Sequence, residues 1–476
     1  MALAGPAEAV FSGPVATVVT ENFTRRVDRS IAFAAVSGLH SASDKTKRID
    51  LKLIVSEQTY SIETLTDPHT GKSIRASMAD VGPRGSNLTW QAIATIIQLV
   101  VGFGIASNRL MLIIGHKAFS SGRMCLLLQW AARLLCPVYT FLGESLGDAS
   151  LVAGDDTPTK VIDLREQVQK DDPLAELDER FGFKSERADG KGAKSTLNVS
   201  MISGRTKEKE PKSTIHFFRT HMGNFGNLLT KILENRKPKT GPLTMQGDLS
   251  SANLPSKATR ELIAIISAGC GAHARRPFWR YRNDDPVLCF YMLSCFFLLA
   301  RLERMIDTRG RTREVTRRLR RRYGGRIWKL ILARAQAVIN GSPISTGRAI
   351  RWPPKTKLHE AANYIINNYD KLTRYLDDPR LEFTNNARER GLRAEVYMLL
   401  ASKFRKTRRG RAALDVLRTI NATCTAAGIT LAVYLREVLP AGALIADNPD
   451  HYTPFAVAER LRTSAETDEA RSTTAA

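Results

Sequence analysis

The sequence predicts an α+β protein built on an α/β core, in which helices flank a mixed sheet. Two acids, Asp155 and Asp248, directly follow β-prone runs, and the chain from 275 to 378 is almost wholly helical in pattern. Strands that end in an acid and alternate with helices favour an α/β sheet. The β-prone runs lie at 149–153, 195–203, 213–218, 242–246 and 262–266.

The N-terminal part predicts a loose arm and then a hairpin. Residues 1–48 are small and polar with little periodicity, which is typical of a flexible arm. Two β-prone runs follow and precede a turn sequence, Asp67-Pro-His-Thr-Gly71. Such a turn sequence predicts a small β-hairpin region over 49–82.

Three helices are predicted next, at about 88–102, 106–115 and 119–136, within a region from 83 to 147. With the break at Gly115, the lengths and spacing of the last two helices are typical of a helix-turn-helix, which is a DNA-binding motif. An ordinary three-helix packing unit explains the same pattern. Arg109, Lys117 and Arg123 are the charges that a DNA-reading face would use.

The rest of the chain divides by pattern into four parts. The α/β core occupies 148–275, with an exposed, charged excursion at 166–194. A helical, Arg-rich block spans 276–378 and interrupts the core, which resumes as helices over 379–463. We expect a disordered tail at 464–476.

Composition points to a polyanionic partner. The chain has 476 residues, a net charge of +24 and a pI near 10, and Lys and Arg neutralise phosphates in most nucleic-acid complexes. None of the 6 cysteines forms a Cys-x-x-Cys pair, so neither a zinc knuckle nor a disulfide framework is expected. The apolar stretch 286–300 is shorter than the ~20 residues that span a bilayer, so we expect no membrane partner.

Two basic runs are candidates for contact with a phosphate backbone. The first lies between Leu302 and Arg326, where like charges at helical spacing would destabilise an isolated helix. The second is Lys403-Phe-Arg-Lys-Thr-Arg-Arg-Gly-Arg411. We predict that these side chains bind DNA: Arg275, Arg276, Arg317, Arg318, Arg320, Arg321, Arg322, Lys403, Arg405, Lys406, Arg408 and Arg409.

Three separated carboxylates could form a metal site in this basic chain. Asp155 and Asp248 follow strands, and Glu389 stands between two arginines at the predicted start of a helix. Carboxylates are the ligands that Mg²⁺ prefers, and two such ions about 3.5–4 Å apart catalyse phosphoryl transfer. Asp156 is the alternative to Asp155. Neighbours on a strand point to opposite faces, so only one of the two acids should point into the site.

Several motifs occur in order along the chain and carry a resemblance. They are Gly154-Asp-Asp-Thr-Pro158, Gln246-Gly-Asp248, Cys270-Gly-Ala-His273-Ala-Arg-Arg, Pro354-Lys-Thr-Lys-Leu358 and Asn385-Asn-Ala-Arg-Glu389-Arg-Gly-Leu-Arg393. Together they closely resemble the transposases of the insertion-sequence 66 family, a group of DDE transposases. The resemblance covers roughly residues 88–454.

This resemblance implies an RNase H-like catalytic fold with Asp155, Asp248 and Glu389 as its metal-binding triad. The helical block between the second and third acids would be an insertion into that fold. The implied chemistry is cleavage of DNA at the ends of a mobile element, dependent on two Mg²⁺ or Mn²⁺ ions. A freed 3′-hydroxyl then attacks target DNA. The implied partners are double-stranded DNA, further copies of the chain and small accessory proteins, in the cytoplasm at the nucleoid.

Residues around the triad are predicted to support it. His273 lies within a family motif and is expected to approach the scissile phosphate or to order the site, while Cys270 is expected to pack. Arg275 and Arg276 would pair with phosphate or with the acids. The remaining supporting residues are Asn385, Asn386, Arg390 and Arg393.

The sequence also departs from the family pattern. Members often carry a cysteine-rich zinc segment near the helix-turn-helix, but 49–76 contains no cysteine, so we expect no zinc there. Thr384 and Pro379 replace a usual Asp and Gly. Two alternatives to an active transposase therefore remain open: a non-catalytic DNA-binding descendant, and an RNase H-like nuclease that cuts without joining.

Overall fold

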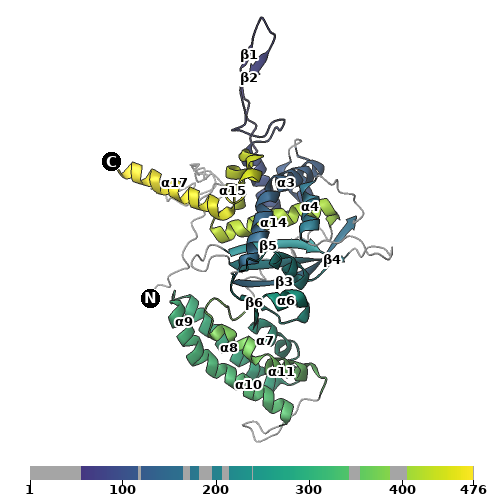
Figure 1. Ribbon diagram of the computed structural model, residues 1–476, viewed down its shortest axis with the longest axis vertical. Coiled ribbons are helices and arrows are strands. Elements are labelled where there is room, and N and C mark those ends of the chain that lie inside the picture. Colours follow the sequence, from purple (N-terminus) through teal and green to yellow (C-terminus); the bar gives the residue numbers. More distant parts are fainter. Residues whose placement is uncertain are drawn as a thin grey trace, which may run out of the picture.

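A central sheet separates two helical bodies in the computed structural model (Figure 1). The structure describes residues 55–115, 119–163, 172–181, 196–205, 214–238, 240–341, 354–385 and 405–474. The predicted arm at 1–48 lies outside these residues.

Five strands form the mixed sheet in the order β5-β4-β3-β6-β7. The first three pair antiparallel, whereas β6 is parallel to β3 and β7 is parallel to β6. A short strand, β8, pairs with the far end of β3. The bounds are β3 Leu151–Asp163, β4 Thr196–Arg205, β5 Thr214–His221, β6 Leu243–Gly247, β7 Ile265–Gly269 and β8 Arg405–Thr407.

Three details differ from the sequence prediction. β3 does not end before Asp155 but continues for 13 residues, because it pairs with β4 from Leu151 to Lys160. β7 begins at Ile265, since Leu262 ends the short helix α6 (Lys257–Leu262). The charged excursion contains a helix, α4 (Pro173–Arg180), whose Leu174 and Leu177 are buried.

One hydrophobic core joins the sheet to the helices nearest β5. It includes Val152 of β3 and Leu228 of α5, together with residues of α1, α3, α14 and α15. The third predicted helix extends to Ser145 and is buried along much of its length. The bounds are α1 Trp90–Ile97, η1 Gln98–Gly102, α2 Ser107–Ile114, α3 Ser121–Ser145, η2 Leu146–Asp148, α5 Phe225–Leu233, α14 Arg408–Ala427, α15 Leu431–Val438, η6 Leu439–Ala441 and α16 Leu444–Asp447.

The burial of α3 bears on the predicted helix-turn-helix. A recognition helix must present a face to DNA, but α3 buries Leu128, Leu135 and Tyr139 and packs against α14. The structure therefore favours the alternative of a packing unit for α3. Recognition of DNA by the region 83–147 stays a prediction.

Helix α14 closes the outer edge of the sheet. Asp415, Thr419 and Thr423 are spaced by one helical turn. Their oxygens accept the backbone N–H groups of Thr220, Phe218 and His216, which are spaced by two residues along β5. Four helical residues rise about 6 Å and two strand residues about 6.6–6.8 Å, so the two spacings match. These contacts satisfy an edge strand that would otherwise offer free donors.

A second core lies in the helical body on the β7 side. It joins Leu151 of β3 and Ala268 of β7 to Trp328, Phe296 and other side chains of the predicted insertion. The bounds are α7 Gly271–Arg280, α8 Pro286–Asp307, α9 Arg313–Leu319, η4 Arg320–Gly324, α10 Gly325–Asn340, α11 Lys357–Asn367, α12 Tyr369–Thr373 and η5 Arg374–Leu376. The described residues between 276 and 378 are thus mostly helical, and the division of the chain into a core and an inserted block stays a prediction.

Among the described residues, two helical segments are long and apolar enough to cross a membrane: Ser121–Asp148 and Pro286–Asp307. A bent pair, Arg408–Ala427 with Leu431–Ala441, would make a third if it were one span. Within the protein α3 packs against α14, and α8 packs against α7 and α10. Their apolar sides thus contribute to the two cores.

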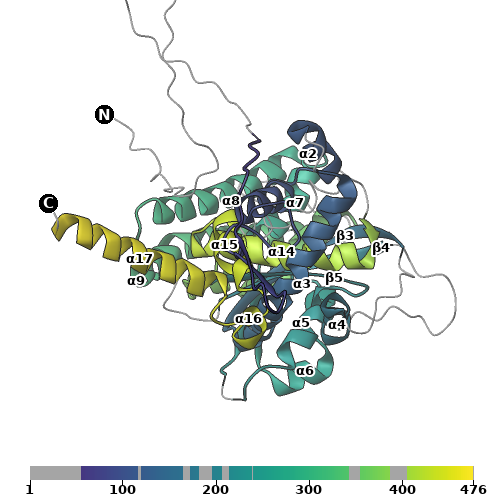
Figure 2. The ribbon, with the colours of Figure 1, turned by 90° about the horizontal axis from the view of Figure 1, so that it is seen from above.

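Two elements extend away from the body. The hairpin of β1 (Thr64–Thr66) and β2 (Ser73–Arg75) is exposed and projects beyond the helices around the predicted turn (Figure 1). Helix α17 (Pro454–Thr474) projects in both views (Figures 1 and 2). The tail predicted to be disordered from 464 is thus helical to Thr474, where Ala, Glu and Arg favour a helix.

Candidate active site

Two of the three predicted acids are associated with neighbouring parallel strands, since Asp155 lies on β3 and Asp248 directly follows β6. The pairing of β3 with β6 runs from Leu151 opposite Thr244 to Ala153 opposite Gln246. Asp155 lies two residues beyond the last of these pairs on β3, Asp248 directly follows the end of β6, and the charge of Asp248 acts on the carboxyl of Asp155. Adjacent strands lie about 4.8 Å apart, so the two carboxylates are within reach of a shared ligand.

Asp155 and Asp156 point to opposite faces of the sheet, as strand geometry requires. Asp156 is held on the face of α5: its carboxylate accepts a hydrogen bond from the hydroxyl of Ser200 and one of 2.6 Å from the backbone N–H of Phe225. The Ser200 hydroxyl also lies 2.6 Å from Nε2 of His221. Asp156 therefore has a structural network of its own.

Asp155 lies on the face of α7, among charged groups. Burial raises the pKa of its carboxyl, and the nearby charge of Asp248 raises it further. A hydrogen bond from the backbone N–H of Asp156 and the charges of His273 and Arg276 act in the opposite direction. Two carboxylates in one half-buried place repel each other, and a divalent cation would remove that repulsion.

The position of Asp248 is fixed by the turn that follows it. One of its oxygens accepts the backbone N–H of Ser250 at 2.9 Å and the amide of Asn253 at 2.7 Å. The hydroxyl of Tyr364, from α11, donates to its backbone carbonyl at 2.9 Å. Leu249 has φ of 64°, a left-handed conformation that non-glycine residues seldom adopt and that is often found at functional sites.

Helix α7 begins at the end of β7 and carries His273, Arg275 and Arg276, and the charges of His273 and Arg276 act on Asp155. Both arginines are exposed and His273 is half-buried. Cys270, just before the helix, is fully buried, and its sulfur accepts the backbone N–H of Asn385 at 3.2 Å. The expectation that Cys270 packs is confirmed.

The segment that leads to Glu389 is bound to the ends of the core strands. Gln246 donates its amide to the carbonyl of Glu382, and the N–H of Gly271 donates to the carbonyl of Phe383 at 2.9 Å. Asn385 is buried, and its amide nitrogen lies 3.5 Å from the carbonyl oxygen of Gly154, next to Asp155. The chain therefore reaches the site four residues before the third acid. Glu389, Asn386, Arg390 and Arg393 lie outside the described residues.

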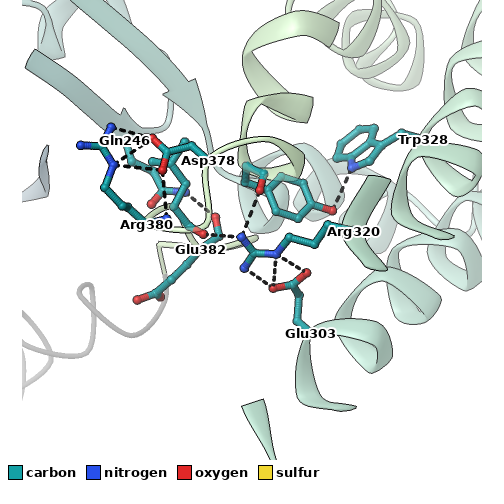
Figure 3. A network of polar contacts seen from close by, with 9 residues as sticks. Gln246, Glu303, Arg320, Trp328, Asp378, Arg380 and Glu382 are labelled. Atoms are coloured by element: carbon teal, nitrogen blue, oxygen red, sulfur yellow. Dashed lines mark hydrogen bonds and ion pairs between the residues drawn. The ribbon is translucent and has the colours of Figure 1, made fainter. Parts of the chain in front are cut away.

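A buried arginine secures this segment from the insertion side (Figure 3). Arg320 is 5% exposed; it binds both oxygens of Glu303 and donates to the carbonyls of Tyr375 and Leu381 at 3.0 and 2.9 Å. The prediction that Arg320 contacts DNA is therefore wrong, because its donors are used inside the protein. Desolvation raises the pKa of Glu303, and the hydrogen bonds and charge of Arg320 oppose that shift.

The other predicted DNA contacts divide by exposure. Arg317, Arg318, Arg321 and Arg322 are exposed, and Arg321 pairs with Asp377. Arg408 and Arg409 are half-buried, and Arg409 lies 3.3 Å from the buried Asp172, which also binds Arg133. Arg409 therefore has a structural partner. Lys403 lies outside the described residues, and Arg405 and Lys406 belong to β8.

Sequence reasoning missed several residues that shape the site. Tyr364 and Asn253 hold Asp248, and Arg380 pairs with Asp378 at 2.8 Å in the segment before Asn385. Asn253 follows Asp248 by five residues, and such a short spacing was a usable signal. Tyr364 comes from a helix more than a hundred residues away, and no local pattern marks it.

The donor set suits a hard divalent cation, since Asp155 and Asp248 offer only oxygen ligands. Among the described residues, no group of three or more His, Cys, Asp or Glu side chains is gathered closely enough to hold a metal ion. The third predicted ligand, Glu389, is not among those residues.

Comparison with known proteins identifies a family for part of the chain. Residues 206–413, a little under half of the chain, match the model of the IS66 family of transposases. The chain carries an IS66-family transposase domain. The resemblance predicted from the motifs is thereby confirmed, and a transposase-type, DNA-processing function follows, with DNA as the implied partner. No curated protein and no solved structure matches the chain.

Proposed function

We propose that this IS66 transposase domain cuts and joins DNA through a DDE triad of Asp155, Asp248 and Glu389. The observation that carries the proposal is the parallel pairing of β3, which contains Asp155, with β6, which directly precedes Asp248, together with the effect of the Asp248 charge on Asp155. Asn385, buried beside Gly154, supports it because the chain approaches the same place four residues before Glu389.

The sheet supports an RNase H-like core as the scaffold. Such a core has three antiparallel strands and then two strands parallel to the first, with the first acid on the first strand. The order β5-β4-β3-β6-β7, with β6 and β7 parallel to β3, has this form. The helical block follows the second acid, as an insertion would.

The metal ions, the carboxylates and the arginines have separate roles in this proposal. Bound Mg²⁺ or Mn²⁺, in a pair as the family implies, would activate the attacking oxygen and stabilise the leaving one. Asp155 and Asp248 supply oxygen ligands from rigid positions, since a strand ladder holds one and Ser250 and Asn253 hold the other. Arg275 and Arg276 are exposed at the edge of the site, where they can bind the phosphates on either side of the reacting one.

Two phosphoryl transfers are proposed in sequence. Water attacks a phosphorus at the element end, and the 3′-oxygen leaves as a free hydroxyl. That hydroxyl then attacks a phosphorus of target DNA, so that a new phosphodiester replaces a broken one. We place this activity in the cytoplasm at the nucleoid, with further copies of the chain and accessory proteins as partners.

The test uses the purified chain, Mn²⁺, and DNA carrying the sequences that flank its coding region. We expect Asp155→Asn, Asp248→Asn and Glu389→Gln each to abolish cleavage while DNA binding persists. Asp370→Asn, an exposed acid in α12, is the matched control and should retain cleavage. Cleavage retained in all three variants would refute the triad. Cleavage without strand transfer would support a nuclease, and binding without cleavage a non-catalytic descendant.

A further inference from the structure

Helix α7 carries an exposed tryptophan on a strongly basic surface. Trp279 is 54% exposed, whereas Trp328, the large aromatic of the neighbouring core, is fully buried. A single exposed apolar side chain is ordinary, but an indole is a flat, rigid plane, and here positive charges surround it. From Gly271 to Arg282 the chain contains four arginines and no acid.

Trp279 and the candidate active site share one helix. Arg276, whose charge acts on Asp155, precedes Trp279 by three residues, and side chains at that spacing are neighbours on a helix surface. Both side chains are exposed, as are Arg275 and Arg280. The basic face of α7 therefore begins near Asp155, beside the first turns of the helix, and ends at the indole of Trp279 in the last turn.

The indole already stacks with a cation. The guanidinium of Arg282 lies 4.5 Å from the centre of the Trp279 ring, and Arg282 also donates to the carbonyl of Trp279 at 2.9 Å. Because the side chain is still 54% exposed with this cation over one face, the ring keeps surface for a flat ligand. The arrangement combines an aromatic plane with positive charge for a phosphate.

We propose that Trp279 is a stacking site for an unpaired nucleobase of the DNA strand being processed. Nucleobases stack on aromatic side chains regardless of sequence, and arginines beside the ring hold the adjoining backbone. A base inside a duplex is covered by its neighbours, so the site takes a base from a frayed or single-stranded end. The charge of the helix favours nucleic acid over a protein partner, which is left as an outcome of the test.

This inference rests on the proposed function for its location near the reacting phosphate, but its test needs no catalysis. The full chain in EDTA is titrated into a DNA duplex bearing a short overhang that contains 2-aminopurine, and fluorescence and anisotropy are recorded. Stacking quenches the probe. We expect Trp279→Ala to lose most of the quenching and to bind the overhang duplex about tenfold more weakly, which lies within the usual contribution of stacking per base.

Matched variants separate stacking from other effects. Trp279→Phe keeps an aromatic plane and should recover most of the quenching. Phe290→Ala removes another exposed aromatic side chain, 73% exposed on α8, and should bind like the unsubstituted chain. With a blunt duplex, or with an abasic overhang, Trp279→Ala should show no loss.

Three outcomes would overturn the proposal. They are unchanged quenching and affinity in Trp279→Ala, an equal loss on blunt and overhang DNA, and a change in oligomeric state without a change in DNA binding. The last would make this face a contact between copies of the chain. Asp155→Asn and Asp248→Asn should retain the stacking signal, so loss of the proposed catalytic function and loss of the stacking site give different results.

Discussion

Arg320 forms an ion pair with Glu303 in which Nε lies 3.1 Å from each carboxylate oxygen and one terminal nitrogen lies 2.6 Å from Oε2. Both side chains are largely buried, and they join the end of α8 to η4. The remaining donors of Arg320 bind the carbonyls of Tyr375 and Leu381. One arginine of the basic run therefore holds the segment that leads to the proposed third ligand.

We expect Arg320→Ala to lower the free energy of unfolding by about 3–5 kcal/mol, the usual cost of breaking a buried ion pair by removing one partner. The loss has two causes, since Glu303 is left as an unpaired charge and two carbonyls lose their donors. Arg321→Ala is the matched control, because Arg321 is 58% exposed and its pair with Asp377 should contribute below about 1 kcal/mol. Chemical denaturation measures both, and equal values would contradict the role of Arg320.

The contacts between α14 and β5 give a second prediction. Thr419→Val keeps the shape of the side chain but leaves the buried N–H of Phe218 without its 2.9 Å acceptor, so we expect a loss of about 1–3 kcal/mol. Thr425→Val, on the exposed side of the same helix, should change stability by less than about 0.5 kcal/mol. Thermal unfolding of the two variants tests this, and a similar loss in both would show that β5 does not depend on α14.

The carboxyl of Asp155 connects pH to metal binding. Its pKa is raised above the usual value near 3.8 by burial and then by Asp248, so in the absence of metal its ionisation costs stability as the pH rises above that value. A cation must displace the proton, so apparent affinity should rise with pH through the acidic range. We expect Mn²⁺ to raise Tm more at pH 7.5 than at pH 5.

Asp155→Asn provides the control for that measurement. It removes a ligand and also the repulsion with Asp248, so the variant should show little Mn²⁺ effect at either pH. Its metal-free Tm at pH 7.5 should exceed that of the unsubstituted chain. A Mn²⁺ effect independent of pH, or one that persists in Asp155→Asn, would argue against this carboxyl as a ligand.

His221 predicts a different dependence on pH. Burial, and then the charge of Arg219, lowers its pKa from 6.5 to about 4, so the folded protein keeps it neutral beside Ser200. Between those values the unfolded chain binds the extra proton, so this contribution to stability is lost as the pH falls from 6.5 towards 4. It amounts to about 3 kcal/mol in full. In His221→Gln the fall in stability from pH 7 to pH 4.5 should be smaller, and an unchanged fall in denaturation experiments would refute it.

The sequence could predict the fold where local chemistry and tertiary packing agree. Strands β4, β5 and β6 lie close to the expected positions because their residue pattern and the neighbouring turn residues mark them. The end of β3 was missed, since its continuation beyond Asp155 depends on pairing with β4 and on β8, far away in the chain. Short-range sequence patterns do not predict pairing between segments that are distant in the chain.

The site was predictable to the same extent. Asp155 and Asp248 stand on or beside strands that can be recognised, and Asp155 was preferred to Asp156 because only one of two neighbours can face the site and because of its place in the family motif. Arg320 could not be separated from Arg317, Arg318 and Arg322 in one basic run. Thr316, Arg320 and Gly324 are spaced four residues apart and are all buried. Threonine, arginine and glycine do not by themselves indicate a buried helix face, so the burial of Arg320 could not be predicted.

The basic run also allows a test of its exposed members. Arg317, Arg318 and Arg322 are exposed, and each phosphate contact contributes about 0.9 to the slope of log K against log salt. Replacing all three with alanine should reduce that slope by about 2–3 and weaken binding to every DNA sequence alike. Arg462→Ala, an exposed arginine on α17, is the control and should leave the slope unchanged. Anisotropy titrations over a range of salt concentrations measure the slope, and an unchanged slope in the triple variant would exclude this surface from the path of the DNA.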